Sequence, residues 1–259
     1  MNFVAARQLL WLTVFGTLAV GQRAQSEPSA PDAPSVPVAA STDSSAFAHR
    51  HLQPYENVWR YTATLPNGTL KVQGLWTDRA ELIEKDARRL MRRVQGMTYV
   101  NGLTSSQINV FDPATMVPAS SEVHRIDGTW LRREFNGLTI TETRGTSPID
   151  TVGVQTTFGV PMQVFDFWGG MYGTLLAALP LSPGYAGTVA AIDEFDPKYK
   201  PASFRVVREE DLMAGKMGRV HAWVVESEGM TFWISANAPY ILKLDMSMSG
   251  GVVAHWDEL

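Results

Sequence analysis

Apolar and polar side chains alternate along several short runs of the chain, which is the pattern of strands that bury one face. In residues 55–65 the odd positions are mostly apolar, as at Trp59 and Tyr61, and the even positions are mostly polar. Residues 240–248 repeat this alternation. Strands are also expected at residues 121–126, 129–135, 138–143, 219–228, 230–235 and 252–256. The pattern therefore predicts a mainly β (α+β) fold.

Tight turns separate several of these runs. An Asn or Asp followed by Gly tolerates the positive φ angles of a two-residue hairpin turn. Such pairs stand at Asn67-Gly68, Asn101-Gly102, Asp127-Gly128 and Asn136-Gly137. We therefore expect neighbouring strands to pair as antiparallel hairpins.

Residues 80–95 are predicted to form a helix, because Ile83, Leu90 and Val94 fall on one stripe at helical spacing. Asp78 is suitably placed to cap its start, and Gly96 to end it. The same residues also suit a pair of long strands, and both interpretations are kept.

A second helix is predicted over residues 164–179. One of its faces would carry Phe165, Trp168, Tyr172, Leu175, Leu176 and Leu179. Gly169, Gly170 and Gly173 lower its intrinsic stability by up to about 1 kcal/mol each. A very apolar but weakened helix is typical of an element that moves, or of one packed tightly on a sheet.

The N-terminus has the layout of a secretory signal peptide, predicted over residues 1–26. A short start with one Arg precedes an apolar run at residues 9–20 and then small residues. This run is shorter than the roughly 20 residues that a membrane-spanning helix needs. Residues 27–51 are rich in Pro, Ala and Ser and are expected to be a disordered tether. Residues 52–259 then form a single domain, exported to the periplasm or the cell exterior, with no transmembrane segment.

Composition removes several classes of function. The formal net charge of −4 argues against a nucleic-acid partner, and the lack of cysteine excludes thiol catalysis and thiolate metal sites. No sequence motif for a nucleotide, a metal or a catalytic nucleophile is present. His124, His221 and His255 lie on expected strands, where a triad with Ser and an acid stays open. We expect a non-enzymatic protein with no catalytic residues, no cofactor and no metal.

Aromatic residues are the most suggestive candidates for a site, because they line apolar ligand cavities as readily as they fill cores. The candidate cavity lining is Trp59, Trp76, Trp130, Phe165, Trp168, Tyr172, Leu176, Trp223 and Trp233. A second candidate is a basic patch on the first expected helix, which suits an acidic partner or anionic lipid headgroups, or is simply a solvated helix face. It comprises Lys85, Arg88, Arg89, Arg92 and Arg93.

Three stretches carry a family resemblance: residues 109–118, 175–184 and 231–244. In order and spacing they resemble a domain-of-unknown-function family of exported bacterial proteins, which is itself similar to the outer-membrane lipoprotein carriers. The resemblance covers residues 55–248. It implies a strongly curved antiparallel sheet, an open half-barrel with one or two covering helices. In the carriers the concave side of this sheet holds acyl chains.

Three hypotheses follow. The first is a non-enzymatic periplasmic protein that binds an apolar ligand, such as a lipid or acyl chain, or a lipidated partner. The second is an envelope scaffold with a filled core that binds another envelope protein. The third is a secreted hydrolase whose catalytic residues are scattered over strands.

Overall fold

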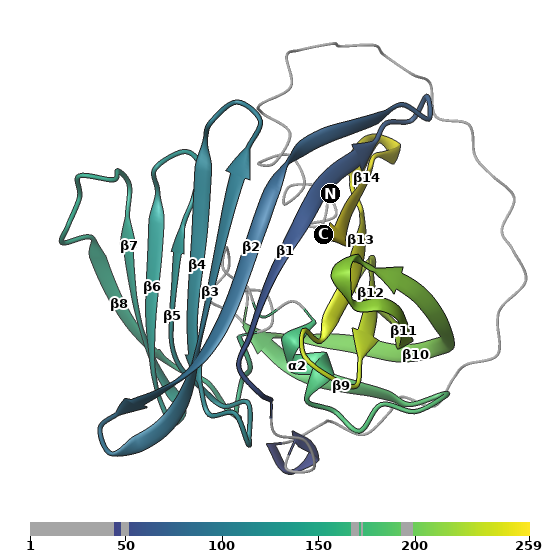
Figure 1. The fold of residues 1–259 in the computed structure, drawn as a ribbon. Coiled ribbons are helices and arrows are strands. Elements are labelled where there is room, and N and C mark those ends of the chain that lie inside the picture. Colours follow the sequence, from purple (N-terminus) through teal and green to yellow (C-terminus); the bar gives the residue numbers. More distant parts are fainter. Residues whose placement is uncertain (1–43, 48–51, 167–170, 172, 193–198) are drawn as a thin grey trace, which may run out of the picture.

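The computed structural model describes residues 44–47, 52–166, 171, 173–192 and 199–259, and its strands form one antiparallel sheet (Figure 1). The first eight are β1 (Tyr55–Thr64), β2 (Leu70–Lys85), β3 (Arg88–Tyr99), β4 (Thr104–Phe111), β5 (Pro118–His124), β6 (Trp130–Asn136), β7 (Thr139–Gly145) and β8 (Val154–Gly159). The other six are β9 (Ala186–Ile192), β10 (Tyr199–Ala214), β11 (Gly218–Ser227), β12 (Met230–Ser235), β13 (Ile241–Ser247) and β14 (Val253–Glu258).

The sheet consists of two meanders joined at their outermost strands. In each meander, β1–β8 and β9–β14, consecutive strands are neighbours, and β1 pairs with β14 between them. The edges are therefore β8 and β9, so the sheet is open. This confirms the predicted mainly β, antiparallel fold.

The hairpin turns lie where the Asn/Asp-Gly pairs predicted them. Gly68, Gly102, Gly128 and Gly137 all have positive φ, between 59° and 82°. A residue with a Cβ is strained in this region, which is why glycine closes these turns. The strands expected at residues 55–65, 121–126, 129–135 and 138–143 are confirmed as β1 and β5 to β7, and β2, β3 and β4 flank the Asn67-Gly68 and Asn101-Gly102 turns.

The helix predicted over residues 80–95 is wrong, and the alternative of two long strands is correct. β2 and β3 run antiparallel and are joined at Asp86 and Ala87, whose φ angles are 51° and 57°. Asp78 does not cap a helix; its carboxylate binds Arg93 on the next strand. The apolar residues therefore alternate across a sheet, which the helical stripe imitated.

The helix predicted over residues 164–179 is also wrong over most of its described length. Phe165 is extended and bridges Ala191 in parallel, and the helix α2 spans only Thr174–Ala177. Trp168, Gly169, Gly170 and Tyr172 lie outside the described residues. Gly173, with φ +73°, precedes α2 and turns the chain into it. A pairing partner far away in sequence thus overrides the local helical pattern.

The described residues 160–166, 171 and 173–181 are here called the crossing segment, and residues 160–166 run from beside β7 to β9, between the two edges of the sheet. Its Val160 N donates to Leu138 O at 2.8 Å, beside β7. Its Phe165 N donates to Ala190 O at 2.7 Å, on β9. Val160 and Val164 also pack with Ile140 and Ile192. The side of the interior that the sheet leaves open is therefore closed by this segment.

The main core lies on one face of the sheet and draws on both meanders and α2. Phe47, in the short 3-10 helix Ser44–Phe47, is fully buried and packs on Phe165 with ring centroids 5.1 Å apart. The core thus reaches into residues 27–51, where a tether was expected. A smaller cluster of Ala214, Ala222, Val224, Trp233 and Leu242 packs apart from it.

The rest of the expected tether and the whole expected signal peptide lie outside the described residues, so the export prediction stays a prediction. Over the residues that the structure does describe, no helix is long and apolar enough to cross a bilayer.

Candidate ligand-binding site

Aromatic rings gather in the interior where β1 joins both β2 and β14. Trp59 faces Trp76 across β1 and β2, and Tyr61 faces Trp256 across β1 and β14. The Tyr61 and Trp256 rings stack with centroids 4.7 Å apart, and Trp76 meets Trp256 edge-on at 5.8 Å. Tyr99 joins through Tyr61 at 6.4 Å. We call Trp59, Tyr61, Trp76, Tyr99 and Trp256 the aromatic cluster.

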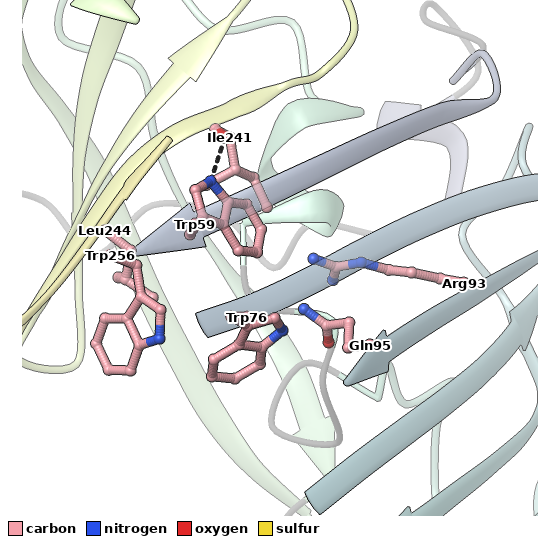
Figure 2. A pocket seen from close by; sticks show the side chains of 7 residues that line it. All are labelled: Trp59, Trp76, Arg93, Gln95, Ile241, Leu244 and Trp256. Carbon is pink, nitrogen blue, oxygen red and sulfur yellow. Dashed lines mark hydrogen bonds between the residues drawn. The ribbon is translucent and has the colours of Figure 1, made fainter. Parts of the chain in front are cut away.

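The aromatic cluster borders a small cavity (Figure 2). Its lining consists of Trp59, Trp76, Arg93, Gln95, Ile241, Leu244 and Trp256. A volume of about 20 Å³ gives room for roughly one water molecule. An acyl chain does not fit unless side chains move.

Two indoles of this cavity, those of Trp59 and Trp256, differ in their hydrogen bonding. Trp59 Nε1 donates to the carbonyl oxygen of Ile241 at 3.3 Å. The buried Trp256 Nε1 has no hydrogen-bond partner among the described residues, and Figure 2 shows this nitrogen on the side of its ring that faces Trp76. The unused N–H of Trp256 therefore borders a cavity that is lined mainly by apolar residues, with Arg93 and Gln95 as its polar members.

The tyrosines of the aromatic cluster stay neutral. Burial raises the pKa of Tyr61 to about 12 and also raises the pKa of Tyr99. An ionised phenol is disfavoured in such surroundings. The cluster therefore carries no charge at physiological pH.

A band of buried polar side chains continues from the aromatic cluster across β1 to β7, on the same face of the sheet. Its members are Asn57, Asp78, Arg93, Gln95, Asn109, Ser121, Arg133 and Glu142. Most are direct cross-strand partners, from Asn57–Asp78–Gln95 to Arg93–Asn109–Ser121–Arg133–Glu142. We call these residues the polar band.

Two ion pairs neutralise the charges of the polar band. Arg93 binds Asp78 in a bidentate manner, with both N–O distances at 2.7 Å, and both side chains are 0% exposed. Arg133 binds Glu142 at 2.7 Å. Burial by itself would lower the pKa of Arg93, but the Asp78 carboxylate raises it above its ordinary value. The guanidinium is therefore held charged in the interior.

The polar band also holds the crossing segment. The buried Asp166 Oδ2 accepts a hydrogen bond from Asn109 Nδ2 at 3.1 Å. Tyr55 donates to Asp78 at 3.0 Å, beside the Arg93 pair. A buried hydrogen bond is costly to break without a replacement. The band therefore fixes the segment that closes the interior.

The match that decides the family covers residues 60–257, from β1 to β14. The chain belongs to the family described as protein of unknown function (DUF3108). No curated protein and no solved structure matches it. The predicted membership of a domain-of-unknown-function family is thereby confirmed, whereas the match does not extend to the outer-membrane lipoprotein carriers.

In this DUF3108 chain the residues expected to line one cavity fall into separate places. Only Trp59 and Trp76 lie at the aromatic cluster, while Phe165 and Leu176 belong to the crossing segment within the main core. Trp168 and Tyr172 lie outside the described residues. The expected single cavity is corrected to a much smaller one that includes Trp256.

The remaining three tryptophans bind other groups. Trp130 Nε1 donates to Asp150 O at 2.8 Å, at the β7–β8 loop. Trp223 Nε1 donates to Glu209 at 3.0 Å, and Trp233 Nε1 donates to Glu210. None of these three lines the cavity beside the aromatic cluster.

The expected basic patch is divided by the hairpin that replaces its helix. Lys85, Arg88 and Arg89 lie exposed at the β2–β3 turn. Arg92 pairs with Glu81 at 3.1 Å, and Arg93 is buried on Asp78. The helical patch is therefore wrong, and its most buried member belongs to the interior.

One arrangement in the chain resembles a catalytic triad. Thr64 Oγ1 lies 2.9 Å from His255 Nε2, and His255 Nδ1 lies 2.8 Å from Asp245 Oδ1. Acyl transfer also needs backbone N–H groups aimed at an oxyanion. Thr64 lies in a strand paired on both sides, and the next amide, Leu65 N, donates to Thr69 O. The three side chains therefore form a hydrogen-bond network across β1, β14 and β13.

In the described ranges, no three His, Asp or Glu side chains lie together in a group suited to hold a metal ion.

The polar band was missed in the sequence because only the position of its residues in the strand alternation reveals it. Asn57 stands in phase with Trp59, and Asp78 with Trp76, so each occupies a position that faces the core. A polar residue at an inward position of a strand is the signal that would have found it.

Proposed function

We propose that the protein is a non-enzymatic envelope protein that binds an acyl chain, from a lipid or a lipid-modified partner, at the aromatic cluster. The aromatic cluster is the observation that carries this proposal. Its five rings are neutral and buried or half-buried, and three of them, Trp59, Trp76 and Trp256, line a small cavity together with Ile241 and Leu244. Apolar ligands bind where such a lining is combined with a few polar groups.

The cavity has to expand for this ligand. A volume of about 20 Å³ admits a water molecule and not a chain of methylenes. The crossing segment is where we expect the opening, because there the interior is closed by one stretch of chain between β7 and β9. Elsewhere it is closed by paired strands.

The architecture of the sheet supports the same proposal at a coarse level, although the family match does not extend to the lipoprotein carriers that the sequence resembles. An open, antiparallel sheet is what the resemblance implied. The covering helices that it also implied are reduced, in the described part of the chain, to the four residues of α2 and short 3-10 turns. In this chain residues 160–166, which include the extended Phe165, lie between the edges of the sheet where those helices were expected.

Binding of a dansyl-labelled undecanoic acid tests the proposal, with energy transfer from tryptophan as the signal. We expect the wild-type protein to bind at micromolar concentration. Trp76→Ala enlarges the cavity and should bind the probe more tightly, by about tenfold if one or two methylenes gain burial. The matched control is Trp223→Ala, which removes an indole outside the cavity and should leave affinity unchanged.

Failure of both the wild type and Trp76→Ala to bind would contradict the proposal. An equal gain in Trp76→Ala and Trp223→Ala would also contradict it, since the probe would then bind loosened protein in general.

An envelope scaffold with a filled core is the second candidate, and the small size of the cavity favours it. The chain also has a larger surface groove of about 590 Å³ across β9 to β12. Its lining combines polar residues with Phe204 and Met230; the polar members include Thr188, Ser203, Arg205, Glu226 and Thr231. Such a groove suits a polar protein segment better than an acyl chain.

A further inference from the structure

Aliphatic side chains are exposed at the tips of three hairpins of the first meander. They are Leu70 and Val72 in β1–β2, Val100 and Leu103 in β3–β4, and Ile149, Val152 and Val154 in β7–β8. Their exposed fractions range from 42% to 88%. Single exposed aliphatic residues are ordinary, but a group of them at one end of a sheet indicates an interaction site.

These tips share one end because of the meander. Alternate turns of consecutive antiparallel strands return to the same end of the sheet. Figure 1 shows the β1–β2, β3–β4 and β7–β8 turns along the upper edge of the first meander. We call this upper edge the aliphatic rim.

The opposite end of the same strands has a different character. Its longest hairpin, β2–β3, ends in Lys85, Asp86, Arg88 and Arg89. Leu138 is the exposed aliphatic residue of the β6–β7 turn there. The concentration of aliphatic side chains is therefore a property of the upper edge and not of hairpin turns in general.

The aliphatic rim carries little negative charge toward solvent. The carboxylates of Asp127 and Asp150 are used inside their own turns, as acceptors from Thr129 N and Gly153 N at 2.9 Å each. Lys71 lies exposed between Leu70 and Val72. The rim thus presents apolar groups and a cation without an outward cluster of acids.

We propose that the aliphatic rim docks the protein on the surface of a lipid bilayer, with the hairpin tips in the boundary between headgroups and acyl chains. A bilayer is an extended apolar phase, so it contacts separated tips at once. Protein interfaces instead concentrate their binding energy in central Trp, Tyr and Arg side chains, which these tips lack. Lys71 is suited to anionic headgroups.

Docking on a bilayer goes beyond the proposed acyl-chain site and does not depend on it. The rim residues are exposed, whereas the aromatic cluster is interior. Loss of vesicle binding with intact probe binding, or the reverse, therefore tells the two proposals apart.

Sedimentation with vesicles of phosphatidylethanolamine and phosphatidylglycerol tests the rim. The rim variant replaces one residue on each tip: Leu70→Ser, Val100→Ser and Ile149→Ser. Its control is Met213→Ser, which alters a residue of 75% exposure near the far end of β10. We expect the rim variant to lose at least tenfold in vesicle partitioning and the control to match the wild type.

Chemical denaturation should give all three proteins the same midpoint, since the altered side chains are exposed. Equal partitioning of the rim variant and the wild type, or no binding by the wild type, would overturn the proposal. The proposal would also be overturned if the rim variant still bound vesicles and 0.5 M salt abolished that binding. Charge alone would then hold the protein on the bilayer. A vesicle-free oligomer that the rim variant dissociates would assign the rim to a protein interface instead.

Discussion

Asp78 and Arg93 form a salt bridge in an interior where hydrophobic residues are the rule. Both side chains are fully buried, and each oxygen of the carboxylate receives a guanidinium N–H. A buried ion pair contributes little net stability relative to apolar residues, but breaking one partner leaves an uncompensated charge. At the residue scale, the polar band is therefore a set of mutually dependent side chains.

We predict that Asp78→Ala lowers the free energy of unfolding by about 3–5 kcal/mol, because Arg93 loses its counter-charge. Glu81→Ala, which breaks the more exposed pair with Arg92, should cost less than about 1 kcal/mol. Urea denaturation of the two variants gives the comparison. Similar costs for both would mean that water or another group compensates Arg93.

A second prediction concerns pH and Glu210. The hydrogen bond from Trp233 Nε1, together with Arg208, lowers the pKa of this carboxyl. A depressed pKa stabilises the fold above the unfolded value near 4.5, and this contribution is lost as pH falls through the folded pKa. Glu210→Gln should therefore melt at a lower temperature than the wild type at pH 7. This difference in melting temperature should be smaller at pH 3. A gap independent of pH would show that ionisation of Glu210 does not contribute.

At the element scale, Gly173 directly precedes α2, the single helical turn of the crossing segment. A Cβ added at this glycine would lie 2.8 Å from the Ile241 side chain, and the φ of +73° is itself unfavourable for other residues. The glycine therefore belongs to a fixed packing arrangement.

Gly173→Ala is accordingly expected to destabilise the protein by about 2–4 kcal/mol, from backbone strain and overpacking together. Gly184→Ala is the matched control, since its φ is +76° and no atom lies within 4 Å of the added Cβ. It should cost about 1–2 kcal/mol from strain alone. Thermal melting of the pair measures the difference, and equal losses would remove the packing contribution.

The edge strand β8 permits a sharper test of register. Val160 N donates to Leu138 O, so alternate residues of β8, including Thr156, should bond to β7, while Thr157 presents its N–H outward. Thr157→Pro should therefore be tolerated better than Thr156→Pro, by at least about 1 kcal/mol. Denaturation midpoints decide this. The reverse order of stability would mean that the register of β7 and β8 differs by one residue from the one described.

At the scale of the whole molecule, the strands and their turns were predictable because their causes are local. Alternation identified β1 and β13, and Asn/Asp-Gly pairs identified four hairpin turns. The long β2–β3 hairpin was misread, since its turn is Asp86-Ala87 and lacks a glycine. The extended conformation of Phe165 depends on its bridge to Ala191, and the burial of Arg93 depends on its ion pair with Asp78. Tertiary structure determines both of these partners.

The candidate site was predictable only in part, for the same reason. Trp59 and Trp76 were expected to line a cavity, and the structure places them at one. Trp256 and the polar band belong to the site because of cross-strand pairing. This pairing places β14 beside β1, although almost the whole chain separates them in sequence. Sequence reasoning could count tryptophans but could not tell which of them share an interior.

The central claim is that the interior receives an acyl chain, and native mass spectrometry of the gently purified protein tests it most directly. The account predicts a species heavier than the protein by one lipid or one acylated molecule, released on denaturation. Trp76→Ala should retain more of it, and Trp223→Ala the same amount as the wild type. Protein that is free of lipid from the outset, and that stays free when incubated with envelope lipids, would contradict the claim.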